Sequence, residues 1–192
     1  GATIVVNGRK NERLVFDTVN EIEQNGGNAI GIIADISDPE AVERMMEHAE
    51  KEHGGLDILV CNAGLRRQTP FLDMSFIEWR EILSVALDGA FLLTKAAVPL
   101  MIKRGRGSIV GLSGISHHIG TASRCHVSAS KAGLEGLMRS LAIELAPYKI
   151  TCNCIAPGLI ETVRGKSSGE RPASSNNNNI PIQRIGDVEE IA

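Results

Sequence analysis

One short stretch, LDILVCNAG at residues 56–64, decides the fold class of this chain. Its first six residues form a short run that is almost entirely apolar, and its last three are small or polar residues typical of a turn. Such a run is typical of a parallel strand covered on both faces, whereas a half-exposed strand alternates between polar and apolar residues. Four more runs of this kind occur along the chain: Ala2–Asn7, Ala29–Ala34, Ser108–Leu112 and Ile150–Ile155.

Long amphipathic segments with helix start signals lie between these runs. Ser37-Asp38-Pro39-Glu40 is a capping box with a proline just inside, which predicts a helix over Glu40–His53. Two longer helices are predicted over Ser75–Leu100 and Ser123–Leu145, and Asp187 with Glu190 begins a last one. Strands that alternate with helices predict an α/β fold, a Rossmann-like doubly wound parallel sheet with helices on both faces, in one domain over residues 1–192.

The composition agrees with one packed domain and excludes several classes of function. Hydrophobic residues make up 43% of the 192 residues, which is too many for a disordered chain. A net charge of −3 gives no basic surface for nucleic acid or anionic membranes, and no uninterrupted apolar stretch is long enough to span a bilayer. The four cysteines lack the CxxC spacing of metal sites, and reduced, mostly buried thiols predict a cytoplasmic protein.

One segment, residues 164–180, interrupts the alternation of strands and helices. It is polar, rich in glycine and serine, and contains four consecutive asparagines at 176–179. Such a segment is typical of a mobile surface loop, and in an enzyme it can serve as a lid over a substrate cleft. We therefore expect a mobile substrate loop here.

The residues that follow the predicted strands are the candidates for a ligand site. Ligands of a doubly wound sheet bind beyond the carboxyl ends of its strands. Four motifs follow strands in this way: Asn7-Gly8-Arg9-Lys10, Asp35-Ile36, Asn62-Ala63-Gly64 and Pro157-Gly158-Leu159-Ile160-Glu161-Thr162. A fifth motif, Ser128-Ala129-Ser130-Lys131, lies on a predicted helix.

In these motifs the chain resembles the short-chain dehydrogenase/reductase family over essentially its whole length. Gly1–Arg9 resembles the second strand of that fold, and Gly55–Gly64 resembles its "LDILVNNAG" strand with Cys61 at the first asparagine. Ala142–Thr162 resembles the family pattern "A-x-E-L-A … I-x-x-N-x-I-x-P-G-x-I-x-T". The chain would then begin at the second strand, without the glycine-rich turn after the first, and end before the last strand. We therefore expect a piece of a longer chain.

The resemblance implies a nicotinamide dinucleotide site. Members that prefer NAD place an acid at the end of the second strand, where this chain has Gly8 followed by Arg9. A guanidinium can bind a 2′-phosphate in bidentate fashion, so Arg9 favours NADP(H) over NAD(H), although exposed arginines after strands are also common. Further cofactor contacts are implied for Asp35 and Ile36 at the adenine, for Asn62, Ala63 and Gly64 at its ribose, for Lys131 at the nicotinamide ribose, and for Pro157, Gly158, Ile160 and Thr162 at the nicotinamide.

The same resemblance implies a catalytic set of asparagine, serine, tyrosine and lysine, of which this chain keeps one member. Counting back from Lys131, the tyrosine position falls at Val127, the serine position at Gly114 and the asparagine position at Ala86. None of these three residues can exchange a proton. Two nearby residues are candidate substitutes: Ser113 and His117. No metal site is expected, because His117 and its neighbour His118 have no acidic or cysteine residue close in sequence.

Two functions remain open at this point. The chain is either an NADP(H)-dependent oxidoreductase acting on a small-molecule alcohol/carbonyl pair, or an inert member that serves as a dinucleotide-binding or partner-stabilising subunit. Helices Ser75–Leu100 and Ser123–Leu145 resemble those that pair across the family's subunit interfaces, which implies a homodimer or homotetramer.

Overall fold

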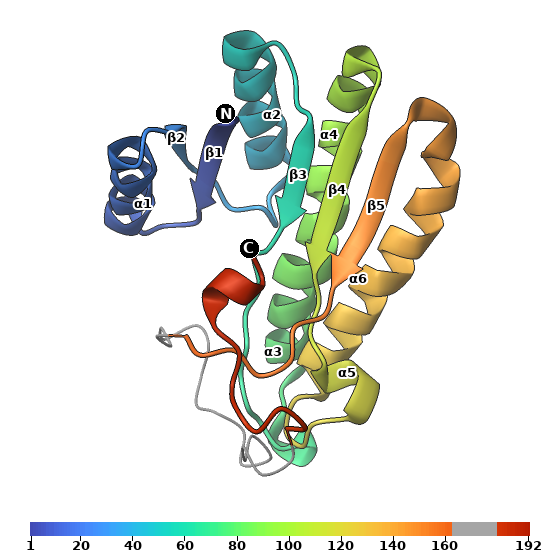
Figure 1. Ribbon diagram of the computed structural model, residues 1–192. Coiled ribbons are helices and arrows are strands. Elements are labelled where there is room, and N and C mark those ends of the chain that lie inside the picture. Colours follow the sequence, from blue (N-terminus) through green and yellow to red (C-terminus); the bar gives the residue numbers. More distant parts are fainter. Residues whose placement is uncertain (163–179) are drawn as a thin grey trace.

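The predicted α/β fold is confirmed by the computed structural model, which describes residues 1–162 and 180–192 (Figure 1). The strands are β1 (Thr3–Gly8), β2 (Asn28–Ile33), β3 (Ile58–Cys61), β4 (Gly107–Leu112) and β5 (Ile150–Ile155). The helices are α1 (Glu12–Gln24), α2 (Pro39–His53), α3 (Phe76–Leu83), α4 (Gly89–Arg104), α5 (Ser116–Ile119) and α6 (Cys125–Glu144). A π-helical segment, η2 (Ser84–Asp88), joins α3 to α4, and short 3-10 turns are η1 (Phe71–Asp73), η3 (Ala146–Tyr148) and η6 (Val188–Glu190).

The strands form two parallel sheets, whereas the sequence predicts one. β1 pairs with β2, and β3, β4 and β5 pair in that order. Among the described residues no strand pairs with the free edge of β1 or of β3, and Figure 1 shows the two sheets side by side with α2 between them in sequence. The family resemblance places one more strand between these two edges, and no described strand occupies that position.

The core of the molecule lies between the three-stranded sheet and the helices behind it. α2 and α4 pack on each other, α4 packs on β3 and β4, and α6 packs on β4 and β5. Ile109 of β4, Met101 of α4 and Leu134 of α6 are fully buried in this layer. Burial alternates along β3, where Leu59 and Cys61 are buried but Val60 is exposed. In the part of the chain that is described, helices therefore cover one face of this sheet rather than both.

The run from α3 through η2 to α4 has the length and apolar composition of a membrane span. By length and composition alone, residues 76–104 could cross a bilayer. Charged residues such as Asp88 and Lys95 interrupt this run, so it is not the uninterrupted apolar stretch that the sequence analysis found missing. Half of its most apolar window is buried inside the fold, where α3 packs on α6 and α4 packs on the sheet. A core helix of a globular domain has the same properties, and we assign it as one.

Local sequence explains where the helices begin. Asp38, not Ser37, caps α2 and accepts from the Glu40 amide, because the Ser37 hydroxyl donates to Asp35 instead. α1 has no capping box and is absent from the sequence prediction, yet the Asn11 side chain caps it. The capping box predicted at Asp187 is present, but it opens only the short turn η6.

Candidate functional site

Lys131 lies in the middle of α6, with its ammonium group buried. Its Nζ donates a hydrogen bond to the carbonyl oxygen of Leu112, at the end of β4. Burial lowers the pKa of Lys131 to about 8, and the positive charge of Arg66 lowers it too, against a smaller opposite effect of two nearby cysteine thiols. The structure thus holds one lysine with a strongly lowered pKa at the carboxyl edge of the three-stranded sheet.

Two other predicted site positions meet Lys131. A Cβ placed on Gly64 would lie 3.7 Å from Lys131 Nζ and 4.0 Å from the Cβ of Ala86. Gly64 follows β3, and Ala86 belongs to the π-helical segment η2, a kind of distortion that is frequent at functional sites. Residues far apart in sequence therefore come together around the lysine, as the resemblance implies.

Apolar groups surround Lys131 at the positions predicted for proton transfer. Val127, one turn before Lys131 on α6, is 5% exposed, and Ala86 is 2% exposed. Gly114 lies just after β4, and a Cβ there would meet no atom within 4 Å. Of these four positions, only Lys131 carries a group that can titrate.

The two candidate substitutes, Ser113 and His117, gather around Glu135 of α6. The Nε2 atom of His117 lies 3.1 Å from Glu135 Oε1, and the Nε2 atom of His118 lies 3.3 Å from the same oxygen. Within the described part of the chain, no hydrogen bond joins Ser113 or His117 to Lys131. The expectation that the two histidines have no acidic partner is wrong, because α6 brings Glu135 back to them. The spacing of Lys131 and Glu135, one helical turn apart, is the signal that could have placed this carboxylate near the site.

A charged pair lies at the carboxyl ends of β1 and β2. The Nε atom of Arg9 is 4.0 Å from Asp35 Oδ2, and both side chains are partly exposed. Burial raises the pKa of Asp35, but hydrogen bonds from the Ser37 hydroxyl and amide and the charges of Arg9 and Lys10 outweigh it, so the net shift is downward. Next to this pair, Ile36 is turned into the core against Gly89.

The remaining predicted cofactor residues lie on two connecting segments. Asn62 and Ala63 are exposed directly after β3. Past β5, the Pro157 carbonyl accepts from the Ile115 amide at 3.1 Å, and Ile160 forms an isolated parallel bridge with Gly186. Gly158 and Thr162 are exposed. The predicted substrate loop, residues 164–180, lies outside the described residues except for its last position.

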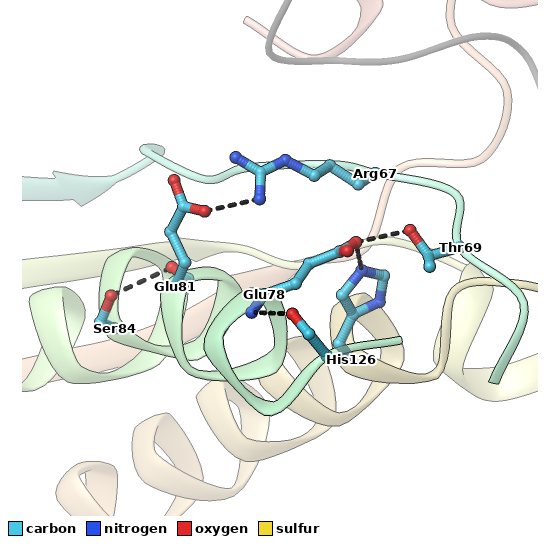
Figure 2. A network of polar contacts seen from close by, with 7 residues as sticks. Arg67, Thr69, Glu78, Glu81, Ser84 and His126 are labelled. Carbon is cyan, nitrogen blue, oxygen red and sulfur yellow. Dashed lines mark hydrogen bonds and ion pairs between the residues drawn. The ribbon is translucent and has the colours of Figure 1, made fainter. Parts of the chain in front are cut away.

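A polar network fixes the segment after β3 onto α3 and α6 (Figure 2). Arg67 Nη1 donates to Glu81 at 2.5 Å, and the Thr69 hydroxyl donates to Glu78 Oε1 at 2.6 Å. The same Glu78 oxygen lies 3.2 Å from Nε2 of the fully buried His126. His126 is thereby held in a structural contact and is turned away from the position of its neighbour Val127. Sequence reasoning missed Glu78 and Glu81, because nothing in their spacing marks a partner.

Comparison with known proteins extends the resemblance to the whole chain. Residues 1–192 match the family model described as enoyl-(acyl carrier protein) reductase. The 3-oxoacyl-(acyl-carrier-protein) reductase of Buchnera aphidicola is 35% identical over 189 residues, which are 98% of this chain and 76% of the relative. The corresponding reductase of Aquifex aeolicus is 35% identical over 192 residues, 100% of this chain and 77% of the relative.

A solved structure shows the same fold. The crystal structure of acetoin dehydrogenase from Salmonella typhimurium superposes on 100% of this chain and 76% of its own, with a TM-score of 0.86 and 34% identity. Together with the convergence of Gly64, Ala86 and Lys131, these matches establish the family. The chain belongs to the short-chain dehydrogenase/reductase family and is an oxidoreductase of that type.

Proposed function

We propose that this chain binds NADP(H) in preference to NAD(H), and that it transfers a hydride between the nicotinamide and a small-molecule alcohol/carbonyl pair at low efficiency. The observation that carries the cofactor preference is the end of β1. A Cβ at Gly8 would lie 2.4 Å from Val15 Cγ2, so an acidic side chain there would require the Val15 side chain of α1 to move. The next residue, Arg9, offers a partly exposed guanidinium to a 2′-phosphate.

The described residues fit a dinucleotide along the carboxyl edge of both sheets. The polar groups of Arg9 and Asp35 lie at one end, and the buried ammonium of Lys131 lies at the other. The cofactor, when bound, supplies the hydride or accepts it. We assign Arg9 to the 2′-phosphate, Asp35 and the backbone of Ile36 to the adenine, Asn62, Ala63 and Gly64 to its ribose, Lys131 to the nicotinamide ribose, and Pro157, Gly158, Ile160 and Thr162 to the nicotinamide.

Low efficiency follows from the groups around Lys131. Reduction of a carbonyl needs a proton as well as a hydride, and neither Val127 nor Ala86 can deliver one. Loss of general acid catalysis typically costs ~10²–10⁴-fold in rate. The proton then comes from water or from one of the candidate substitutes, Ser113 and His117.

A second function is favoured by the same burial. Val127 and Ala86 are packed into the core, so two of the positions that carry proton-transferring side chains in the family are here occupied by buried apolar side chains. A protein of this design would bind the dinucleotide and serve as an inert or partner-stabilising subunit. Turnover separates the two functions.

We base the proposed substrate class, oligomeric state and cellular location on the family to which the chain belongs. The relatives reduce a 3-oxoacyl group or act as an acetoin dehydrogenase by name, which supports a carbonyl or alcohol substrate for this chain. We propose a soluble, cytoplasmic homodimer or homotetramer that binds neither nucleic acid nor membranes. Phe91 of α4 and Ile143 of α6 are exposed apolar side chains that such an interface would cover. Sedimentation analysis tests the oligomeric state.

Calorimetric titration with NADPH and with NADH tests the cofactor preference. We expect tighter binding of NADPH, and the Arg9→Glu variant should lose at least about tenfold in NADPH affinity, because charge-assisted hydrogen bonds contribute ~1.5–3 kcal/mol. Arg106→Glu is the matched control, since Arg106 lies at the opposite edge of the sheet, paired with Asp57. Equal affinity for the two cofactors, or equal effects of the two variants, would contradict the assignment.

A hydride-transfer assay with NADPH and NADP⁺ over a panel of ketones and alcohols tests turnover. Slow turnover that is abolished by Lys131→Ala supports the oxidoreductase. Cofactor binding without any turnover supports the inert subunit.

A further inference from the structure

We propose that His117, His118 and Glu135 form a binding site for a divalent transition-metal ion of the Zn²⁺ class. The site lies between the short helix α5, which carries both histidines, and the middle of α6 (Figure 1). One ligand atom from each residue lies within 4.8 Å of the others. This site contains none of the proposed cofactor contacts, but it shares His117 with the candidate proton donors named above.

The distances suit a metal. Zinc binds imidazole nitrogen and carboxylate oxygen at about 2.0–2.2 Å, and a tetrahedral arrangement therefore places ligand atoms roughly 3.3 Å apart. The two histidine Nε2 atoms lie 3.1 and 3.3 Å from Glu135 Oε1. The third separation, between the two histidine nitrogens, is at most 4.8 Å, and a rotation of the 51% exposed His118 side chain would shorten it.

The buried histidine supplies a second, independent observation. The side chain of His117 is 8% exposed, yet neither of its ring nitrogens makes an aligned hydrogen bond. An unsatisfied buried polar group costs about 1–3 kcal/mol, and such groups are rare in folded proteins. A metal ion bound to Nε2 would satisfy that lone pair and account for its approach to Glu135.

Glu135 is prepared as an anionic ligand. Arg139 Nη1 lies 3.4 Å from the other oxygen, Oε2, which leaves Oε1 for the ion. Such outer contacts orient the ligands of a metal site.

Water and ions can reach the cluster. A hollow of about 260 Å³ adjoins Glu135 beside Arg139, Asn153 and Cys154, and neither histidine lines it. Exposed His118 opens the other side. Two imidazoles and one carboxylate with room for water favour Zn²⁺, Co²⁺ or Ni²⁺, whereas Mg²⁺ and Ca²⁺ prefer oxygen ligands.

The test is metal binding to the full chain after removal of metals with a chelator. Titration with Zn²⁺ against a chromophoric chelator should show one ion bound per chain, and Co²⁺ should give the visible absorption of a nitrogen- and oxygen-ligated site. Zn²⁺ should raise the melting temperature, but Mg²⁺ should not. Glu135→Gln, His117→Ala and His118→Ala should each weaken Zn²⁺ binding more than the ~10–100-fold typical of outer contacts.

Control variants distinguish a metal site from an ion pair between Glu135 and the two histidines. His53→Ala removes an exposed histidine at the end of α2 and should leave Zn²⁺ affinity unchanged. His118→Ala changes an exposed side chain, so it tests the site even if the buried variants fail to fold. If Zn²⁺ binds no more tightly to the parent chain than to Glu135→Gln and His118→Ala, the cluster is a proton-shared ion pair and the proposal is overturned. NADPH affinity of His118→Ala and of His53→Ala should not change.

Discussion

Two neighbouring stretches of α6 face the end of β4 and differ in the chemistry they offer. The first contains Val127 and Lys131, and between them lie two serines, of which the buried Ser130 donates to the Val127 carbonyl. The second, one turn further on, contains Glu135 and meets Ser113, His117 and His118. The asparagine, serine and tyrosine that the family resemblance expects beside Lys131 are thus absent, whereas two imidazoles and a carboxylate gather one helical turn further on. A shared fold therefore fixes where a cofactor can lie, but not which residues complete the site.

The largest effect is expected from a variant that restores the family's proton-transfer side chains around Lys131. The combined variant Val127→Tyr, Gly114→Ser and Ala86→Asn restores the three proton-transfer side chains that the family uses. We expect NADPH-dependent reduction of a ketone to rise by about 10²–10⁴-fold, the usual contribution of general acid catalysis. The measurement is the initial rate of NADPH oxidation, and an unchanged rate in a folded variant would show that the missing groups do not limit turnover.

The buried charge of Lys131 should be visible in stability against pH. Its pKa falls from 10.5 to about 8 in the folded chain, so between these values the unfolded chain holds more protons and stability rises with pH. Lys131→Met removes this dependence. At pH 7 the free energy of unfolding of Lys131→Met should exceed that of the parent chain, and this difference should shrink by about 3 kcal/mol as pH rises to 10.5. Urea unfolding at several pH values measures it, and parallel curves for the two proteins would argue against a buried ammonium.

Glu135 should change stability less than Lys131 does, and at acidic rather than alkaline pH. Because its pKa is lowered in the folded chain, its ionised form stabilises the fold above the ordinary carboxyl pKa, and this stabilisation is lost as pH falls through the folded value. Glu135→Gln should be less stable than the parent at pH 7, and the gap should close in acid. Glu144→Gln, at the exposed end of α6, is the matched control. Unfolding is measured with a chelator present, and a gap that persists in acid would contradict the ion-pair account.

The smallest effect is expected at Gly114. A Cβ there meets nothing within 4 Å, so Gly114→Ser should change the free energy of unfolding by less than about 0.5 kcal/mol. Val127→Tyr enlarges a buried side chain and should destabilise by ~1–3 kcal/mol. Thermal unfolding of the two single variants compares them. Equal destabilisation would mean that the loop after β4 is packed more tightly than the structure shows.

The strands were predictable because each is a short apolar run that ends in small or polar residues. β5 has the predicted bounds, and β1 and β2 differ from prediction by one residue at each end. Periodicity did not predict the break of the sheet between β1 and β3, because it reports burial and not which strand pairs with which. The family resemblance did imply the break, since it gives the sequence no counterpart of the family's first strand, which lies in the middle of the sheet, and the two sheets agree with it. The same limit applies to η2, since a π-helical turn leaves the apolar pattern of a long helix almost unchanged.

The candidate site was predictable only where the family resemblance supplies motifs. It led to Gly64, Ala86 and Lys131, which the structure brings together. It did not lead to Glu135, because reasoning about His117 considered neighbours in sequence, whereas the partner lies on the next helix. Helix α6 passes close to α5, and only tertiary structure reports such a contact.

The most direct test of this account is calorimetric binding of NADPH to the parent chain and to Lys131→Met. The central claim is that α6 keeps the cofactor anchor while its surroundings have lost the groups for proton transfer. We predict that the parent chain binds NADPH and that Lys131→Met binds it at least about tenfold more weakly, since a hydrogen bond from a charged group contributes ~1.5–3 kcal/mol. Equal affinity of the two proteins, or no binding to the parent chain, would contradict the claim.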